Sequence, residues 1–178
     1  MSKILYLLRH AKSSREDNQL DDFDRPLNPR GLHDAHLIKE AVQKRQIMPD
    51  KIYSSPAKRA QQTALIIREK SLYFEASQLE LVRELYDNHM DWVKWLSKFV
   101  KKLPDFHKEV LIVGHNPMLE ETFHYLTGKF VYFSTWTLAA IKFPLDSRKE
   151  VGPQSGKKLF VDKPSIFKNY KERALNNL

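Results

Sequence analysis

The 178-residue sequence contains no cysteine. Disulfide frameworks, thiolate zinc sites, iron–sulfur clusters and cysteine nucleophiles are therefore excluded. Long hydrophobic runs are also missing, since no apolar run approaches the roughly 18–20 residues that span a bilayer. The N-terminus turns polar after a short apolar run at residues 4–8 and has no small-residue cleavage site. We expect neither a signal peptide nor a membrane span, and therefore a cytoplasmic protein.

Acidic residues are fewer than basic ones, and most of the imbalance lies near the C-terminus. The formal net charge is +8, and residues 142–178 contribute nine basic against four acidic residues. A basic segment can contact nucleic acid or an acidic partner. Here the basic residues are spread out and few aromatic residues accompany them, so the segment does not resemble an RNA-binding module. A solvated extension is the simpler interpretation, and nucleic acid is not favoured as a partner.

Short apolar runs alternate with longer amphipathic segments along most of the chain. Runs with the length of buried strands lie at residues 4–8, 51–54, 74–82, 109–113 and 135–143. Helical spacing of apolar residues predicts helices over residues 31–46, 55–70, 89–102 and 117–127. Ser55-Pro56 and Asn116-Pro117 look like helix caps followed by a first-turn proline.

This alternation predicts an α/β protein with one domain. We expect a three-layer sandwich with a mainly parallel central sheet and helices on both faces. The domain is predicted to cover residues 1–143. Turn formers and charges dominate residues 144–178, which are predicted to form a basic C-terminal extension with little regular structure.

Histidine and arginine side chains follow three of the predicted strands. Arg9 and His10 come directly after the first strand, Arg59 follows the second by one helical turn, and His115 follows the strand at 109–113. Because open parallel sheets bind ligands at the carboxyl ends of their strands, we expect these side chains to meet. Imidazoles and cations gathered near helix N-termini are typical of a phosphate site.

Four motifs then resemble those of a known family in both order and spacing. They lie at residues 8–13 (LRHAKS), 25–31 (RPLNPRG), 54–64 (SSPAKRAQQTA) and 113–117 (VGHNP). The motifs are similar to those of the histidine phosphatase superfamily, whose fold is phosphoglycerate mutase-like. Alanine in place of glycine at position 11, followed by Lys12 and Ser13, looks most like the SixA-like phosphohistidine phosphatases. The resemblance covers residues 3–143.

The resemblance implies a role for each of these side chains. His10 would be the nucleophile, Arg9 and Arg59 would clamp the phosphoryl group, and His115 would complete the pocket. Ser13 is a further candidate for phosphate binding. A neutral imidazole can hold phosphorus covalently, and permanently charged guanidinium groups suit the phosphoryl oxygens. No metal or organic cofactor is implied, because arginine and histidine supply the charge that magnesium supplies elsewhere.

The general acid is not specified by the motifs. The superfamily places a glutamate after the third strand, where this chain has Glu84. The alternative interpretation of Glu84 is an ordinary surface residue, and Asp22 and Asp24 in the long loop after the nucleophile are rival donors. A phosphohistidine substrate needs little help from an acid, because imidazole leaves more easily than an alkoxide.

The leading hypothesis is therefore a cofactor-independent phosphatase that hydrolyses phosphohistidine on proteins through an intermediate on His10. A phosphatase acting on small phosphorylated molecules is the alternative, and a non-catalytic phosphate-binding module is disfavoured because the motifs are complete. A metal hydrolase could use histidines and aspartates in the same region, but no ligand motif accompanies them. Those candidate ligands are His10, Asp22, Asp24, His33, His36 and His115.

Overall fold

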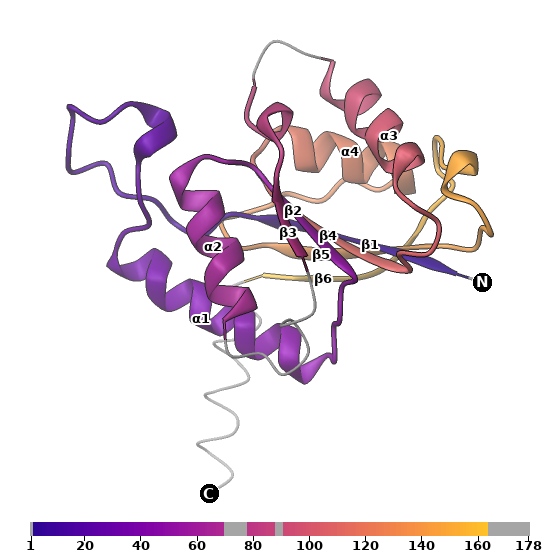
Figure 1. The fold of residues 1–178 in the computed structure, drawn as a ribbon, viewed down its shortest axis with the longest axis horizontal. Coiled ribbons are helices and arrows are strands. Elements are labelled where there is room, and N and C mark those ends of the chain that lie inside the picture. The colour runs from indigo at the N-terminus through magenta and orange to yellow at the C-terminus, as the bar shows by residue number, and fades with distance from the viewer. Residues whose placement is uncertain (1, 70–77, 88–90, 164–178) are drawn as a thin grey trace, which may run out of the picture.

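A six-stranded mixed sheet lies at the centre of the protein (Figure 1). The structure is a computed structural model that describes residues 2–69, 78–87 and 91–163. The strands are β1 (Lys3–Arg9), β2 (Lys51–Ser54), β3 (Gln78–Leu81), β4 (Glu109–Gly114), β5 (Leu138–Phe143) and β6 (Lys157–Asp162). Their order across the sheet is β3-β2-β4-β1-β5-β6, with β5 and β6 antiparallel to their neighbours and the other pairs parallel. The predicted mainly parallel sheet is confirmed.

Helices cover both faces of this sheet. They are α1 (Pro29–Lys44), α2 (Lys58–Arg68), α3 (Trp92–Lys102) and α4 (Met118–Thr127). Figure 1 shows α1 and α2 on one face and α3 and α4 on the other, and each pair packs into a separate hydrophobic core. The predicted three-layer α/β sandwich is therefore confirmed. None of the described helices is long and apolar enough to cross a bilayer.

The continuous apolar run of β1 follows from its position in the middle of the sheet. Leu5 and Leu7 point into the core beneath α3 and α4, whereas Tyr6 and Leu8 point into the core beneath α1 and α2. Fully burying a leucine side chain contributes roughly 1.5–3 kcal/mol, so a strand with both faces covered is strongly held. The carboxyl end of β1 is thereby fixed in place.

Regular structure continues beyond residue 143, and the prediction of little regular structure there is wrong for two segments. Residues Arg148–Glu150 form a 3-10 turn, η3, and Lys157–Asp162 form the edge strand β6 against β5. Asp162 of β6 accepts two hydrogen bonds from Arg45, at 2.5 and 2.7 Å. The strand was not recognisable because its short apolar centre is flanked by charges and most of its side chains stay partly exposed. Residues 164–178 lie outside the described part of the chain.

Candidate active site

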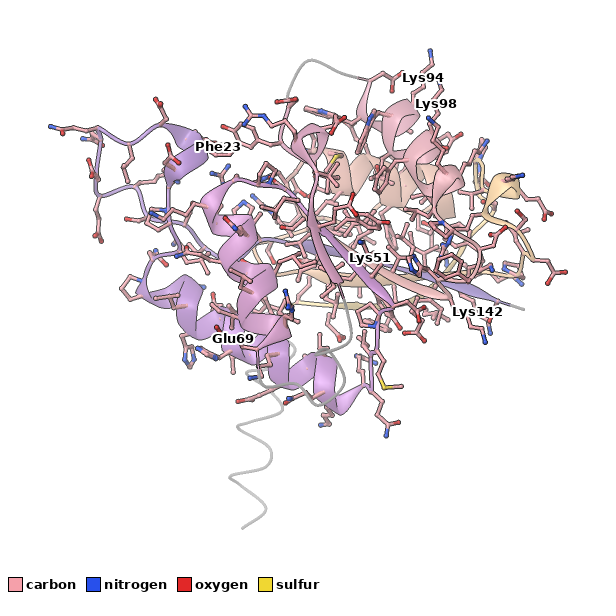
Figure 2. All side chains as sticks on the ribbon, in the orientation of Figure 1. Phe23, Lys51, Glu69, Lys94, Lys98 and Lys142 are labelled. Carbon is pink, nitrogen blue, oxygen red and sulfur yellow. The ribbon has the colours of Figure 1, made fainter. Side chains whose placement is uncertain are left out.

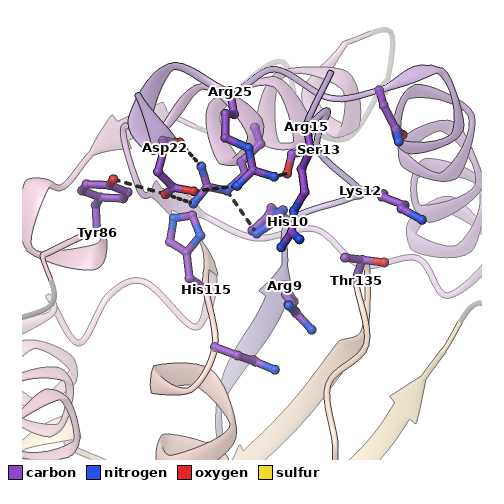
Figure 3. Close-up of a pocket in the computed structure, with 13 residues that line it drawn as sticks. Arg9, His10, Lys12, Ser13, Arg15, Asp22, Arg25, Tyr86, His115 and Thr135 are labelled. Carbon is purple, nitrogen blue, oxygen red and sulfur yellow. Dashed lines mark hydrogen bonds and ion pairs between the residues drawn. The ribbon is translucent and has the colours of Figure 1, made fainter. Parts of the chain in front are cut away.

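A polar pocket of about 600 Å³ opens at the carboxyl ends of β1, β2 and β4 (Figure 3). The predicted residues Arg9, His10, Arg59 and His115 all contribute to its wall. The rest of the wall comes from loops: Lys12, Ser13, Arg15, Asp22, Arg25, Asn28, Tyr86, Asn116 and Thr135. The three strand ends therefore meet as expected.

His10 is a buried imidazole whose tautomer is set by its neighbours. Its Nδ1 lies 2.6 Å from the carbonyl oxygen of Ala11, which can only accept, so Nδ1 carries the proton. Its Nε2 is then unprotonated, and its lone pair accepts a hydrogen bond from Nε of Arg59 at 3.3 Å. Burial, together with the charges of Arg59 and Arg9, lowers the pKa of His10 from 6.5 to about 3. The ring is neutral at physiological pH, with the lone pair on Nε2.

His115 stands beside His10, with 4.9 Å between the ring centroids. Its Nε2 shares a hydrogen bond of 2.8 Å with the hydroxyl of Ser55. Loss of hydration, together with the interactions with His10 and Arg59, lowers the pKa of His115 to about 2. The pocket thus holds two neutral imidazoles side by side.

The two predicted arginines are held differently. Arg9 donates from Nη1 to the carbonyl oxygen of Phe133 at 2.6 Å, while its buried Nε has no hydrogen-bond partner among the described residues. Arg59 extends from the first turn of α2, is only 7% exposed, and has all three of its nitrogens engaged. Arg9 therefore has a buried nitrogen without a partner among the described residues, whereas each nitrogen of Arg59 makes a hydrogen bond.

Asp22 accepts hydrogen bonds from Arg59 through both its backbone oxygen and its carboxylate. One carboxylate oxygen accepts from Nη1 of Arg25 at 2.7 Å, and the other accepts from Nη2 of Arg59 at 2.8 Å and from the Tyr86 hydroxyl at 3.3 Å (Figure 3). Partial burial raises the pKa of Asp22, but the hydrogen bonds and charges of Arg59 and Arg25 outweigh it, and the pKa lies below its usual value. Asp22 is therefore ionised at neutral pH.

Two of the three candidate acids lie elsewhere. Glu84 is exposed on η2 (Arg83–Leu85) and lines a different hollow, together with Trp95 and Lys98 of α3. Asp24 is exposed on η1 (Asp22–Asp24) and is not among the residues that line the pocket. The expectation that Glu84 supplies the acid finds no support in this geometry, because Glu84 lines that other hollow and not the pocket around His10.

Ser13 lines the pocket as predicted, and Arg25 explains how it is held. Arg25 donates from Nη2 to the Ser13 hydroxyl at 2.9 Å and from Nε to the backbone oxygen of Ser14 at 2.8 Å. Arg25 thus ties both ends of the loop over residues 14–25 together. It belongs to the 25–31 motif, but its sequence neighbours do not reveal that its side chain reaches the pocket.

The predicted caps at Ser55 and Asn116 are wrong. The helices begin later, at Lys58 and Met118, and neither residue before them caps through its side chain. Ser55 instead contacts His115, and Asn116 donates from Nδ2 to the carbonyl oxygen of Phe133 at 2.8 Å. Ser55 therefore holds a residue of the pocket wall, and Asn116 is itself part of that wall.

A true cap lies at the start of α1. The side chain of Asn28 accepts from the backbone nitrogen of Gly31 at 2.7 Å, and Pro29 occupies the first helical position. The backbone here presses against the segment after His10, because the nitrogen of Asn28 donates to the carbonyl oxygen of Lys12 at 3.0 Å. A Cβ on Gly31 would lie 1.9 Å from that same oxygen, so only glycine fits. This contact places residues 11–13 at the pocket.

No group of three or more histidine, aspartate and glutamate side chains within the described ranges is arranged to hold a metal ion. His33 and His36 lie at exposed positions of α1 and do not line the pocket. The basic side chains that line the pocket are those of Arg9, Lys12, Arg15, Arg25 and Arg59.

A sequence profile of the histidine phosphatase superfamily (branch 1) matches residues 5–93. The chain belongs to this superfamily. The matched residues include the first three motifs and reach from β1 into α3, and the VGHNP motif lies beyond them. The predicted enzyme class, a histidine phosphatase, is confirmed.

Two curated proteins are similar to this histidine phosphatase along most of its length. An uncharacterized chloroplastic protein of Arabidopsis thaliana is 29% identical, with 88% of this chain and 73% of that protein covered. A protein of Hydrogenobacter thermophilus named "Putative phosphoserine phosphatase 2" is also 29% identical, with 71% of this chain and 79% of that protein covered.

Solved structures place this histidine phosphatase among SixA-like proteins. The putative phosphohistidine phosphatase SixA of Agrobacterium tumefaciens has a TM-score of 0.72 and 25% identity, covering 91% of this chain and 98% of that structure. SixA complexed with tungstate shares the fold with a TM-score of 0.78 at 18% identity, over 92% and 99% of the two chains. A phosphoglycerate mutase of Plasmodium falciparum shares it with a TM-score of 0.61 at 15% identity, over 93% and 92%. The fold is thus phosphoglycerate mutase-like.

Proposed function

We propose that the protein hydrolyses phosphohistidine on other proteins through a covalent phosphohistidine on Nε2 of His10. The neutral ring and its outward lone pair support this role, since Nδ1 is committed to the carbonyl oxygen of Ala11. In the first step Nε2 forms a bond to phosphorus, the bond from phosphorus to the substrate imidazole breaks, and that imidazole takes a proton from water. In the second step water attacks phosphorus, the bond from phosphorus to Nε2 of His10 breaks, and the proton lost by that water passes to solvent, which restores the proton taken in the first step.

Arg9, Arg59, His115 and Ser13 are proposed to bind the oxygens of the transferred group. Phosphoryl transfer is catalysed mainly by positioning and by stabilising charge on the equatorial oxygens. The unpartnered Nε of Arg9 supports such a role, because a buried guanidinium nitrogen without a partner is costly unless a ligand pairs with it. The same charge would make a metal or organic cofactor unnecessary.

The choice of substrate rests on the ionisation of the carboxyl group in the pocket. Among the described residues that line the pocket, Asp22 is the only acid, and two arginines keep it ionised. An alkoxide leaving group requires a proton donor, whereas an imidazole leaving group requires little assistance. A pocket with this composition favours phosphohistidine over phosphate esters.

The connection between β3 and α3 favours a substrate carried on a protein. Residues 82–91 alone join these elements, so no additional domain is inserted at this edge of the pocket. A phosphorylated side chain on a protein surface needs such open access, whereas small metabolites are usually enclosed.

A phosphatase for small phosphorylated molecules is the second candidate. Lys12 and Arg15 add two cations to the pocket beyond Arg9, Arg25 and Arg59. Such cations could bind the carboxylate of a small substrate, as the name of the Hydrogenobacter thermophilus relative suggests for that protein.

Steady-state kinetics of the purified chain would separate these functions. We expect kcat/KM to be higher for a phosphohistidine peptide than for phosphoserine or an alkyl phosphate, and unchanged after treatment with EDTA. The His10→Gln variant serves as the inactive control. Preference for phosphoserine would support the second candidate, and an EDTA-sensitive activity restored by one divalent metal would support a metal hydrolase.

A further inference from the structure

The carboxylate of Asp22 stands where an anionic substrate group would be expected. It lies between Arg25 and Arg59, both of which line the pocket around His10. Arginine binds carboxylates and phosphoryl groups through the same planar arrangement of N–H donors. Asp22 therefore resembles a bound anion that is supplied by the protein itself.

Three of the five N–H donors of Arg59 are used in this arrangement. Its Nε donates to Nε2 of His10, its Nη1 donates to the backbone oxygen of Asp22, and its Nη2 donates to the Asp22 carboxylate. A phosphoryl group on Nε2 of His10 would bring its oxygens to this same guanidinium. The donors that hold Asp22 can pair with those oxygens only after Asp22 is released.

The segment that carries Asp22 is held lightly. No residue of η1 is buried, and the Asp22 side chain is 53% exposed. Beyond its bonds to the arginines and to the Tyr86 hydroxyl, the segment is held by Phe23, which is labelled in Figure 2. The Phe23 ring packs edge-to-face against Tyr86, with 5.0 Å between centroids, and lies beneath the guanidinium of Arg83. Moving Asp22 away from Arg59 therefore exposes little apolar surface.

We propose that Asp22 is an internal competitor for anionic substrates, whose carboxylate competes with the incoming phosphoryl group for Arg59 and Arg25. This inference rests on the proposed phosphoryl site at His10. A tethered group has an effective concentration of about millimolar or more, so a free anion must overcome that concentration to bind. A dianionic phosphoryl group gains more from two guanidinium groups than a monoanionic carboxylate does, whereas a monoanion gains nothing from the exchange.

Two consequences follow for substrate choice and turnover. Terminal phosphoryl groups with two negative charges can displace Asp22, while phosphodiesters and other monoanions are disfavoured. Inorganic phosphate formed in the reaction competes with the Asp22 carboxylate for the same two arginines, and it is therefore released more easily. The low pKa of Asp22 agrees with this role, because competition requires the ionised form and proton donation requires the protonated form.

The test compares anion binding to the full-length protein and to Asp22→Asn by isothermal titration calorimetry. Tungstate and perrhenate are suitable probes, because both are tetrahedral and they carry two charges and one charge, respectively. Removing the competitor should tighten tungstate binding by about tenfold, since apparent affinity scales with the fraction of Arg59 that is free. Perrhenate binding should tighten by about the same factor, because the same competitor is removed for both anions.

Asp24→Asn is the matched control, because it removes the same charge from the same 3-10 turn at an exposed position outside the pocket. We expect Asp24→Asn to bind tungstate with less than about a twofold change, and Asp22→Glu, which keeps the carboxylate, to retain weak binding. Thermal unfolding of each variant checks that the fold is intact. Tighter binding in Asp22→Asn alone supports competition. Weaker binding in that variant, or the same change in both asparagine variants, overturns it.

Anion binding does not depend on turnover, so this test is separable from the proposed function. If Asp22→Asn tightens tungstate binding but the protein does not hydrolyse phosphohistidine, the competition stands and the substrate assignment fails. If phosphohistidine is hydrolysed but Asp22→Asn binds tungstate no more tightly than Asp24→Asn, the competition fails and the substrate assignment stands.

Discussion

Nε of Arg59 donates a hydrogen bond to Nε2 of His10 over 3.3 Å. The pairing joins the carboxyl end of β1 to the first turn of α2, two segments separated by 49 positions in the sequence. It also orients the lone pair of His10 towards the most densely charged part of the pocket. The imidazole and the guanidinium are therefore positioned together before any phosphoryl group arrives.

This pairing predicts where a phosphoenzyme will form. Brief incubation with a phosphohistidine peptide or a small phosphodonor should label His10 on Nε2, with a bond that is labile to acid and stable to base. Peptide mass spectrometry under alkaline conditions would locate the label. His10→Gln should abolish it, whereas His33→Gln, an exposed position on α1 outside the pocket, should leave it unchanged. Label on a serine or an aspartate would contradict the mechanism.

Arg59 should be far more important than its neighbour in the sequence. Arg59→Ala is expected to lower kcat/KM by at least ~100-fold on any phosphorylated substrate, because it removes a charge aimed at the transition state. Lys58→Ala is the matched control, since Lys58 is exposed and does not line the pocket. Comparable losses in the two variants would indicate that general surface charge, and not a clamp, is responsible.

Glu84 should be dispensable. Because Glu84 is exposed and faces a different hollow, Glu84→Gln should change kcat/KM by less than about twofold on phosphohistidine peptides and on phosphate esters alike. Steady-state kinetics on both substrate types would check this. A large loss on esters alone would show that η2 turns Glu84 towards the pocket during catalysis.

The two histidines should make the protein less stable in acid. Their pKa values in the folded state are about 3 for His10 and about 2 for His115, against 6.5 ordinarily. As pH falls below about 6.5, the two histidines bind protons in the unfolded chain but stay neutral in the folded chain. The free energy of unfolding therefore decreases towards pH 3. Urea denaturation as a function of pH would measure the slope, which should be shallower in the variant His10→Gln/His115→Gln. An equal slope in both proteins would show that carboxyl groups alone cause the loss.

Gly31 should be essential for stability at the site. Gly31→Ala places a Cβ 1.9 Å from the backbone oxygen of Lys12, and relieving such a clash is expected to cost about 1–3 kcal/mol or more. Activity should also fall, because Lys12 lies two residues after His10. Gly152→Ala is the control, since a Cβ there meets nothing within 4 Å. Chemical denaturation and steady-state kinetics of both variants would measure the differences in stability and in activity. Equal values for the two variants would show that α1 shifts outward to make room for the Cβ.

Much of the fold could be predicted from the sequence, because buried central strands have an unambiguous pattern. The run at residues 51–54 coincides with β2, and the run at 109–113 falls one residue short of β4. The edge strand β6 could not be predicted in the same way, because only part of it is buried and its pairing with β5 is non-local. Helix starts were also misplaced where Ser55 and Asn116 turned out to serve the pocket.

The sequence by itself determined which chemistry gathers at the sheet edge. Arg9 ends β1, His10 and His115 stand directly after β1 and β4, and the carboxyl ends of such parallel strands must share one edge. Only the tertiary structure decided which acid belongs to the site. Asp22 reaches Arg59 because a loop folds back over the strand ends and is tied there by Arg25, while Glu84 lies on a 3-10 turn and lines a different hollow. Loop paths depend on contacts between residues far apart in the chain, and no local pattern of side chains records them.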